Sequence, residues 1–153
     1  MGTENGLLAV SVERTVAGVR LRFTVRREPW GLSLRCEGDD RKYEPLWRVL
    51  EAAWGPTVHA FLKTVAERHG TSWEGVVSFA YGDDYPQADY PDEKLEPGMV
   101  RCSYFDEDLD VPEAFFRACA EAACCAALEA AARMGVEPKD APLMREFVAK
   151  TPP

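Results

Sequence analysis

The chain has 153 residues and a mass of 17.1 kDa, enough for one domain with its own hydrophobic core. Its 26 acidic residues outnumber its 18 basic ones, which gives a formal net charge of -8 and a pI near 4.8. This balance argues against a nucleic-acid-binding protein, because such proteins neutralise phosphates with basic side chains. No apolar run approaches the roughly 18 residues of a membrane-spanning helix, so we expect no membrane segment.

The first third of the chain predicts three antiparallel strands. Residues 19–25 and 32–36 alternate between apolar and polar side chains, residues 7–12 are largely apolar, and glycine and proline separate the runs. One face of this meander would therefore cover the core. The opposite face would be basic, because it would carry four arginines: Arg20, Arg22, Arg26 and Arg35.

Helices and strands follow in turn. Residues 45–53 and 57–69 place apolar side chains at helical spacing, whereas residues 73–81 and 99–105 return to strand character. The segment 82–98 between these strands is rich in proline, aspartate and tyrosine, and a loop of that length is usually functional. Large aromatic side chains are usually buried, so we expect all four tryptophans in or beside the core: Trp30, Trp47, Trp54 and Trp73.

The most clearly marked element is a helix over 112–134. Asp110 would cap its N-terminus, with Pro112 in the first turn and Glu113 close behind. A short C-terminal helix follows over about residues 142–150. Together these elements predict a single α+β domain over residues 1–153, with about five strands in a mostly antiparallel sheet and the helices packed on one of its faces.

The helix over 112–134 offers a second possible role. By helical spacing, Cys124 and Leu128 fall on its charged side, where they would either form a contact surface or be covered by the C-terminal helix. The first alternative would make the protein a homodimer through this helix.

Cysteine usage indicates a reducing compartment. The five cysteines are odd in number and include no Cys-x-x-Cys pair, so we expect free thiols and a cytoplasmic location. Residues 1–6 lack the basic and apolar regions of a secretory signal.

Negative charge is concentrated between residues 82 and 113. This window holds eleven acids and two bases, a charge of -9, so the rest of the chain sums to +1. Tyrosines are interleaved with the acids, and aromatic side chains amid charge suit a surface that binds a basic protein partner, although a merely solvated acidic loop is the alternative. We expect the partner-binding residues to be Asp83, Asp84, Tyr85, Asp89, Tyr90, Asp92, Glu93, Tyr104, Asp106, Glu107 and Asp108.

Metal and cofactor motifs are missing. The run from Asp106 to Asp110 resembles the first half of an EF-hand loop, but Val111 and Arg117 stand where that loop needs glycine and glutamate. The sequence has no zinc-type cysteine pair, no P-loop and no dinucleotide-binding fingerprint. We therefore expect no metal, no cofactor and no catalysis; the alternative is a small hydrolase that uses carboxylates and His59.

In its size, acidic cluster and missing catalytic motif, the chain resembles the small immunity proteins that bacteria encode beside polymorphic toxins. The resemblance implies a stoichiometric inhibitor that covers a basic toxin domain with carboxylates and aromatic side chains. The other two readings of the sequence are the carboxylate-dependent enzyme and a homodimeric scaffold or adaptor without catalysis.

Overall fold

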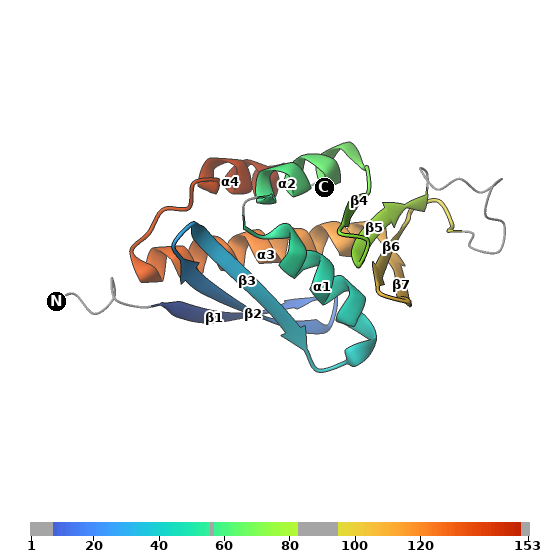
Figure 1. Ribbon diagram of the computed structural model, residues 1–153, viewed down its shortest axis with the longest axis horizontal. Helices are drawn as coiled ribbons and strands as arrows, with labels where there is room; N and C mark the ends of the chain where they lie inside the picture. The colour runs from blue at the N-terminus through green and yellow to red at the C-terminus, as the bar shows by residue number, and fades with distance from the viewer. Residues whose placement is uncertain (1–7, 56, 83–94, 151–153) are drawn as a thin grey trace.

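The computed structural model describes residues 8–55, 57–82 and 95–150. Within these residues, four α-helices, one 3-10 helix and seven strands form an α+β fold with two antiparallel sheets (Figure 1). The α+β class is confirmed, but the expectation of one sheet of about five strands is wrong. The strand order is β1-β2-β3 in the first sheet and β4-β5-β6-β7 in the second.

The first sheet is an antiparallel meander of three strands: β1 (Ala9–Val16), β2 (Val19–Glu28) and β3 (Gly31–Gly38). Its inner face is built by residues that stand opposite one another in register, such as Val12, Phe23 and Cys36, all of them buried. The period-two pattern of the sequence places these side chains on one face, as expected.

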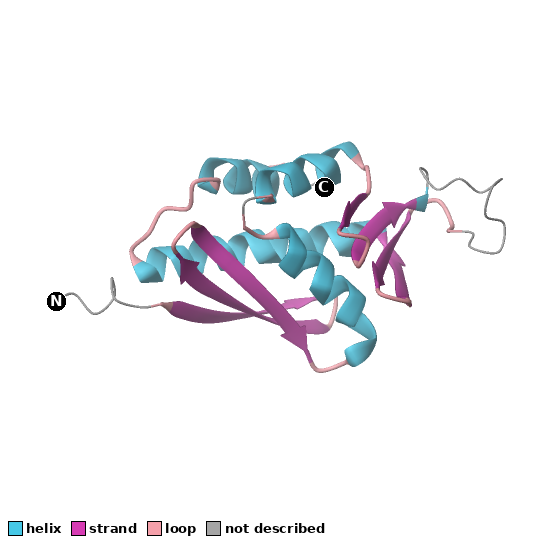
Figure 2. Ribbon diagram, in the orientation of Figure 1, coloured by secondary structure: helices cyan, strands magenta, loops and turns pink. Residues whose placement is uncertain are grey.

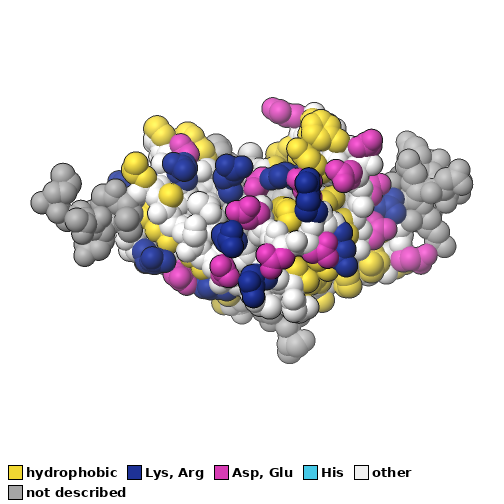
Figure 3. All heavy atoms as spheres, turned by 90° about the horizontal axis from the view of Figure 1, so that it is seen from below, with side chains coloured by type: hydrophobic (Ala, Val, Ile, Leu, Met, Phe, Trp, Pro, Cys, Tyr) yellow, Lys and Arg dark blue, Asp and Glu magenta, His cyan; other side chains and the backbone are white. Residues whose placement is uncertain are grey.

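The outer face of this sheet carries both signs of charge, so the expected basic surface is wrong. Arg22 lies 3.7 Å from the carboxylates of both Glu13 and Glu37, its cross-strand neighbours. Arg20 lies 3.9 Å from Asp39 in the loop that follows β3. Seen from below, basic and acidic side chains are interspersed on this side of the molecule (Figure 3).

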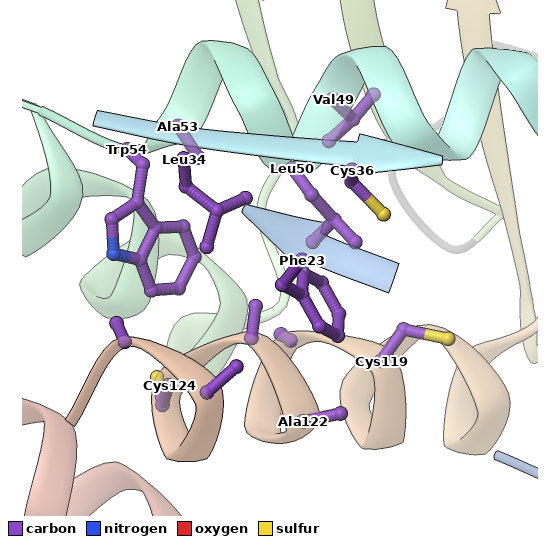
Figure 4. Packing of buried hydrophobic residues seen from close by; sticks show 14 of the residues in the cluster. Phe23, Leu34, Cys36, Val49, Leu50, Ala53, Trp54, Cys119, Ala122 and Cys124 are labelled. Carbon is purple, nitrogen blue, oxygen red and sulfur yellow. The ribbon is translucent and has the colours of Figure 1, made fainter. Parts of the chain in front are cut away.

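The helix α1 (Glu44–Ala53), preceded by the 3-10 helix η2 (Arg41–Tyr43), connects the two sheets. It contacts β3 of the first sheet and β5, β6 and β7 of the second. Its apolar side chains Val49, Leu50 and Ala53 are fully buried and lie near Leu34 and Cys36 of β3 (Figure 4). The buried residues of both sheets therefore belong to one contiguous core.

The second sheet contains four strands: β4 (Thr71–Trp73), β5 (Val77–Tyr81), β6 (Met99–Tyr104) and β7 (Glu107–Pro112). The single strand expected over 73–81 is wrong, because a turn with positive φ at Glu74 and Gly75 divides it. The strand β7 was not expected, because acidic residues have low strand propensity. Leu109 and Val111 nevertheless alternate with the acids, and these two side chains face the core.

Three further helices cover the sheets: α2 (Val58–Glu67), α3 (Glu113–Met134) and α4 (Ala141–Ala149). The long helix α3 packs on β1 and β2 on one side and against α4 on the other (Figure 2). Aromatic rings join α2, β5 and α3, since the centroids of Phe61 and Phe116 lie 5.7 and 5.1 Å from that of Phe79. Both expected helix ranges, 112–134 and 142–150, are confirmed to within a residue.

Two expected details, the capping role of Asp110 and the burial of Trp30, are wrong, and for Cys124 the alternative of burial under the C-terminal helix holds. Asp110 does not cap α3; it lies in β7, and Pro112 occupies the N-cap position without a side-chain hydrogen bond. Cys124 is fully buried, because α4 covers that side of α3. Trp30 is 55% exposed, because it lies in the tight turn between β2 and β3.

Candidate functional site

Part of the expected partner-binding surface lies outside the described residues, namely Asp83, Asp84, Tyr85, Asp89, Tyr90, Asp92 and Glu93. The remaining members, Tyr104, Asp106, Glu107 and Asp108, all lie in or beside the turn that joins β6 to β7. The site is therefore built from this hairpin and from what surrounds it.

A two-residue turn, Phe105 and Asp106, joins the paired residues Tyr104 and Glu107. The backbone N–H of Phe105 donates a hydrogen bond of 2.8 Å to the carbonyl oxygen of Val76 in the neighbouring β4–β5 turn. The two turns therefore lie side by side at one end of the second sheet. We call their exposed residues the acidic tip: Glu74, Phe105, Asp106, Glu107 and Asp108.

The backbone of the acidic tip is strained. Phe105 has a φ of 54° and Glu74 a φ of 55°, both in the left-handed region that favours glycine. A bulky side chain in that region is uncommon, and such residues cluster at functional sites. Ala17 in the β1–β2 turn and Arg68 at the end of α2 also have positive φ, so these angles arise from the tight turns themselves.

Phe105 is the most exposed large apolar side chain among the described residues, at 68%. Its ring packs against that of Tyr104, and the two ring centroids lie 4.7 Å apart. Beneath Tyr104 lies the guanidinium of Arg48, at 5.6 Å from the ring centroid. Arg48 in turn donates hydrogen bonds of 2.8 Å to both Glu44 and Glu51, so α1 fixes the whole stack.

Carboxylates without counter-ions lie in the same two turns as Phe105. Glu74, Asp106 and Glu107 are exposed and form no ion pair within the described part of the chain. Asp108 accepts a hydrogen bond of 2.7 Å from the hydroxyl of Ser103 and forms no ion pair within the described residues. The acidic tip therefore combines one ordered aromatic side chain with uncompensated negative charge.

Other acids of the same sequence window are neutralised. Asp110 accepts two hydrogen bonds from Arg101, at 2.7 and 3.0 Å. Glu113 is bound through both oxygens by Arg68. These carboxylates stabilise the second sheet and the start of α3, so they are not part of the candidate surface.

Two members of the acidic tip were not among the expected site residues. Phe105 lies within the acidic window of the sequence but was not expected to bind the partner, and Glu74 lies outside that window. The Glu74-Gly75 pair is a turn signal in the sequence. This pair of residues does not show that the β4–β5 turn lies beside the β6–β7 turn.

The geometry gives little support to the two alternative functions, a carboxylate-dependent enzyme and a homodimeric scaffold. His59 and His69 are both exposed, and the described residues contain no group of three or more His, Cys, Asp or Glu able to hold a metal ion. The apolar side of α3 is covered by β1, β2 and α4.

Throughout residues 8–55, 57–82 and 95–150, no helix combines the length and hydropathy needed to cross a lipid bilayer.

Comparison with known proteins finds no matching family model, no similar curated protein and no similar solved structure.

Proposed function

We propose that the protein is a stoichiometric inhibitor that binds a basic protein partner through the acidic tip. The observation that carries this proposal is the position of Phe105. Its ring is 68% exposed and packs against Tyr104, and the two turns at this end of the sheet carry carboxylates without counter-ions. Interfaces are dominated by a few buried aromatic anchors, and charge around them selects the partner.

Binding would proceed without any chemical step. The carboxylates of Glu74, Asp106, Glu107 and Asp108 would attract a positively charged surface and orient it. Phe105 would then enter an apolar pocket bordered by lysine or arginine side chains. Since the ring and its turn are already ordered, little conformational entropy would be lost on binding.

The resemblance to immunity proteins suggests the partner's class, a toxin domain with a basic active-site surface. All five cysteines are free thiols, which fits a protein that works in the cytoplasm beside its partner. A toxin made in the cytoplasm must be neutralised there. The protein would do so by covering the basic surface of the toxin domain.

The proposal is tested with the product of the neighbouring reading frame. If that product stops growth when expressed alone, co-expression of the wild-type protein should restore growth. Phe105→Ala should not restore it, and the purified variant should bind the partner at least about tenfold more weakly, as for an aromatic hot spot. Restoration of growth by Phe105→Ala at wild-type affinity would refute the assignment of the surface.

A charge-matched pair of variants separates the acidic tip from the net charge of the protein. Asp106→Asn/Glu107→Gln removes two charges from the tip, and Glu13→Gln/Glu37→Gln removes two from the outer face of the first sheet. Only the first variant should lower the association rate, and the difference should shrink as salt rises, because exposed charges are screened over about 8 Å at physiological ionic strength. Equal effects would mean that only the net charge matters.

A further inference from the structure

A cavity of about 580 Å³ opens where three connections of the fold meet: the β2–β3 turn, the junction of α1 with α2, and the connection from α3 to α4 (Figure 1). Its size lies within the usual range for ligand sites. The floor is apolar and includes Leu32, Trp54, Val58, Val136, Pro138 and Met144. None of the residues that line it belongs to the acidic tip.

Trp30 stands on the rim of this cavity with 55% of its surface exposed. The edge of its indole lies against Gly55, where a β-carbon would come within 3.1 Å of the ring. Gly55 has a φ of 118°, a conformation that side chains rarely adopt, so this close approach depends on glycine. The Trp30 ring is therefore supported from below and presents its remaining surface for stacking.

Trp54, which lines the same cavity, has an unsatisfied hydrogen-bond donor. The side chain is 6% exposed, and its indole Nε1 has no acceptor among the described residues. Figure 4 shows this nitrogen on the edge of the ring that faces away from Leu34. Buried donors are nearly always paired in native proteins. A carbonyl oxygen that entered the cavity could accept a hydrogen bond from this donor only if the indole turned, because other atoms now cover the nitrogen.

Charges of both signs on the rim indicate what kind of molecule would fit. The side chains of Lys139 and Asp140 form no ion pair within the described residues, whereas Glu137 is bound by Arg145 at 3.0 Å. Glu28 and Arg27 also line the cavity, so three acids and two bases surround it. A phosphate or carboxylate ligand would face these acids. A peptide backbone, in contrast, offers neutral carbonyl groups to Lys139 and to the Trp54 donor.

We propose that this cavity binds an extended, proline-rich peptide segment of a partner protein. A proline ring would stack on Trp30, and a backbone carbonyl would accept a hydrogen bond from Trp54 Nε1. Polyproline II segments have no internal hydrogen bonds, so their carbonyl groups are free, and they are ordered before binding. Proline also lacks an N–H, so it leaves no unsatisfied donor on the apolar floor. This site is separate from the acidic tip and does not depend on it.

The test uses a capped oligoproline peptide, with a capped glycine-serine peptide of the same length as the control. Both are titrated into isotopically labelled wild-type protein while the backbone and indole N–H resonances are followed by NMR. Oligoproline should shift the indole resonance of Trp54, identified by its loss in Trp54→Phe, and the glycine-serine peptide should not. The same spectra show whether each variant is folded.

Two variants address the two contacts. Trp30→Ala removes the stacking surface at an exposed position and should weaken binding at least tenfold. Trp54→Phe keeps an aromatic ring in the core but removes the donor, and should also weaken binding by about tenfold, which corresponds to about 1.4 kcal/mol. Phe105→Ala is the matched control outside the cavity and should bind oligoproline as the wild type does.

Three results would overturn the inference. One is no shift with oligoproline up to about 1 mM, the weakest affinity that still counts as binding here. The second is unchanged affinity in Trp30→Ala. The third is equal binding of the glycine-serine peptide. Loss of partner binding in Phe105→Ala with unchanged oligoproline binding would separate this site from the proposed inhibitor function.

Discussion

Glu51 of α1 accepts a hydrogen bond of 2.9 Å from the backbone N–H of Cys36 in β3. β3 is an edge strand of the first sheet, so no further strand accepts hydrogen bonds from its outer N–H groups. The Glu51 side chain takes that place for the N–H of Cys36. The other oxygen of the same carboxylate accepts a hydrogen bond from Arg48. One side chain therefore joins the edge of the first sheet to the stack beneath the acidic tip.

Replacing this carboxylate should destabilise the fold. Glu51→Ala leaves the buried N–H of Cys36 without an acceptor, so we expect a loss of about 1–3 kcal/mol in the free energy of unfolding. Glu51→Gln keeps an acceptor oxygen and should recover part of that loss. Urea denaturation of the three proteins measures both effects, and equal stability of Glu51→Ala and the wild type would contradict the role of this bond.

Two phenylalanines should differ sharply in what they contribute to stability. Phe116 is fully buried among Phe61, Phe79 and Tyr81, so Phe116→Ala should cost about 3–5 kcal/mol. Phe105→Gly loses the contact with Tyr104 but relieves a strained φ, and the two effects are each about 1 kcal/mol. Its unfolding free energy should therefore stay within about 1 kcal/mol of the wild type in the same denaturation experiment. If Phe105→Gly lost as much unfolding free energy as Phe116→Ala, Phe105 would be a residue that stabilises the fold.

Acid should weaken the fold partly through Glu44. Hydrogen bonds from Arg48 and then Arg41 hold the pKa of this carboxyl below its ordinary value of 4.5. A group whose pKa is lower in the folded state stabilises the fold above its unfolded pKa, and this stabilisation is lost as the pH falls through the folded-state pKa. The urea midpoint should therefore drop below about pH 4.5, and less steeply in Glu44→Gln. Parallel pH profiles for the two proteins would exclude this contribution.

Four of the five thiols should be unreactive in the folded protein. Burial raises the pKa of Cys119 to about 12, and it also raises the pKa values of Cys36, Cys102 and Cys124. Only Cys125 is half-buried, so brief alkylation near pH 8 should label this residue first, as mass spectrometry of peptides would show. In urea all five should react. Rapid native labelling of Cys124 would contradict its burial beneath α4.

The same raised thiol pKa values give the fold an alkaline limit. A thiol whose pKa is higher in the folded state stabilises the fold below its unfolded pKa, and this stabilisation declines as the pH rises above that value. The urea midpoint should therefore fall above about pH 9. A midpoint that stayed constant into strongly alkaline solution would show that the buried thiols do not limit stability.

The predictability of this fold follows from how each element is stabilised. β2 and β3 bury one face, so their alternating pattern is visible in the sequence. β7 depends on cross-strand partners, Arg101 for Asp110 and Ser103 for Asp108, which no local pattern reveals. The division into two sheets, with α1 contacting both of them, likewise has no local signal in the sequence.

The candidate site was only partly predictable for a related reason. The acids at 106–108 are visible in the sequence as a charged run. Their lack of counter-ions depends on which side chains lie near them in the folded protein, and the sequence does not show that. Asp110 belongs to the same run and is paired with Arg101. Trp30 was expected in or beside the core because large aromatic side chains are usually buried. It is exposed because it lies in a tight turn.

The stack from Phe105 through Tyr104 and Arg48 to Glu51 ends on an amide of the first sheet. Anything that immobilises the ring at one end would restrain the opening motion that lets the Cys36 amide exchange with solvent at the other. Slower deuterium uptake at that single amide would therefore report, from the far end of α1, that the acidic tip is occupied.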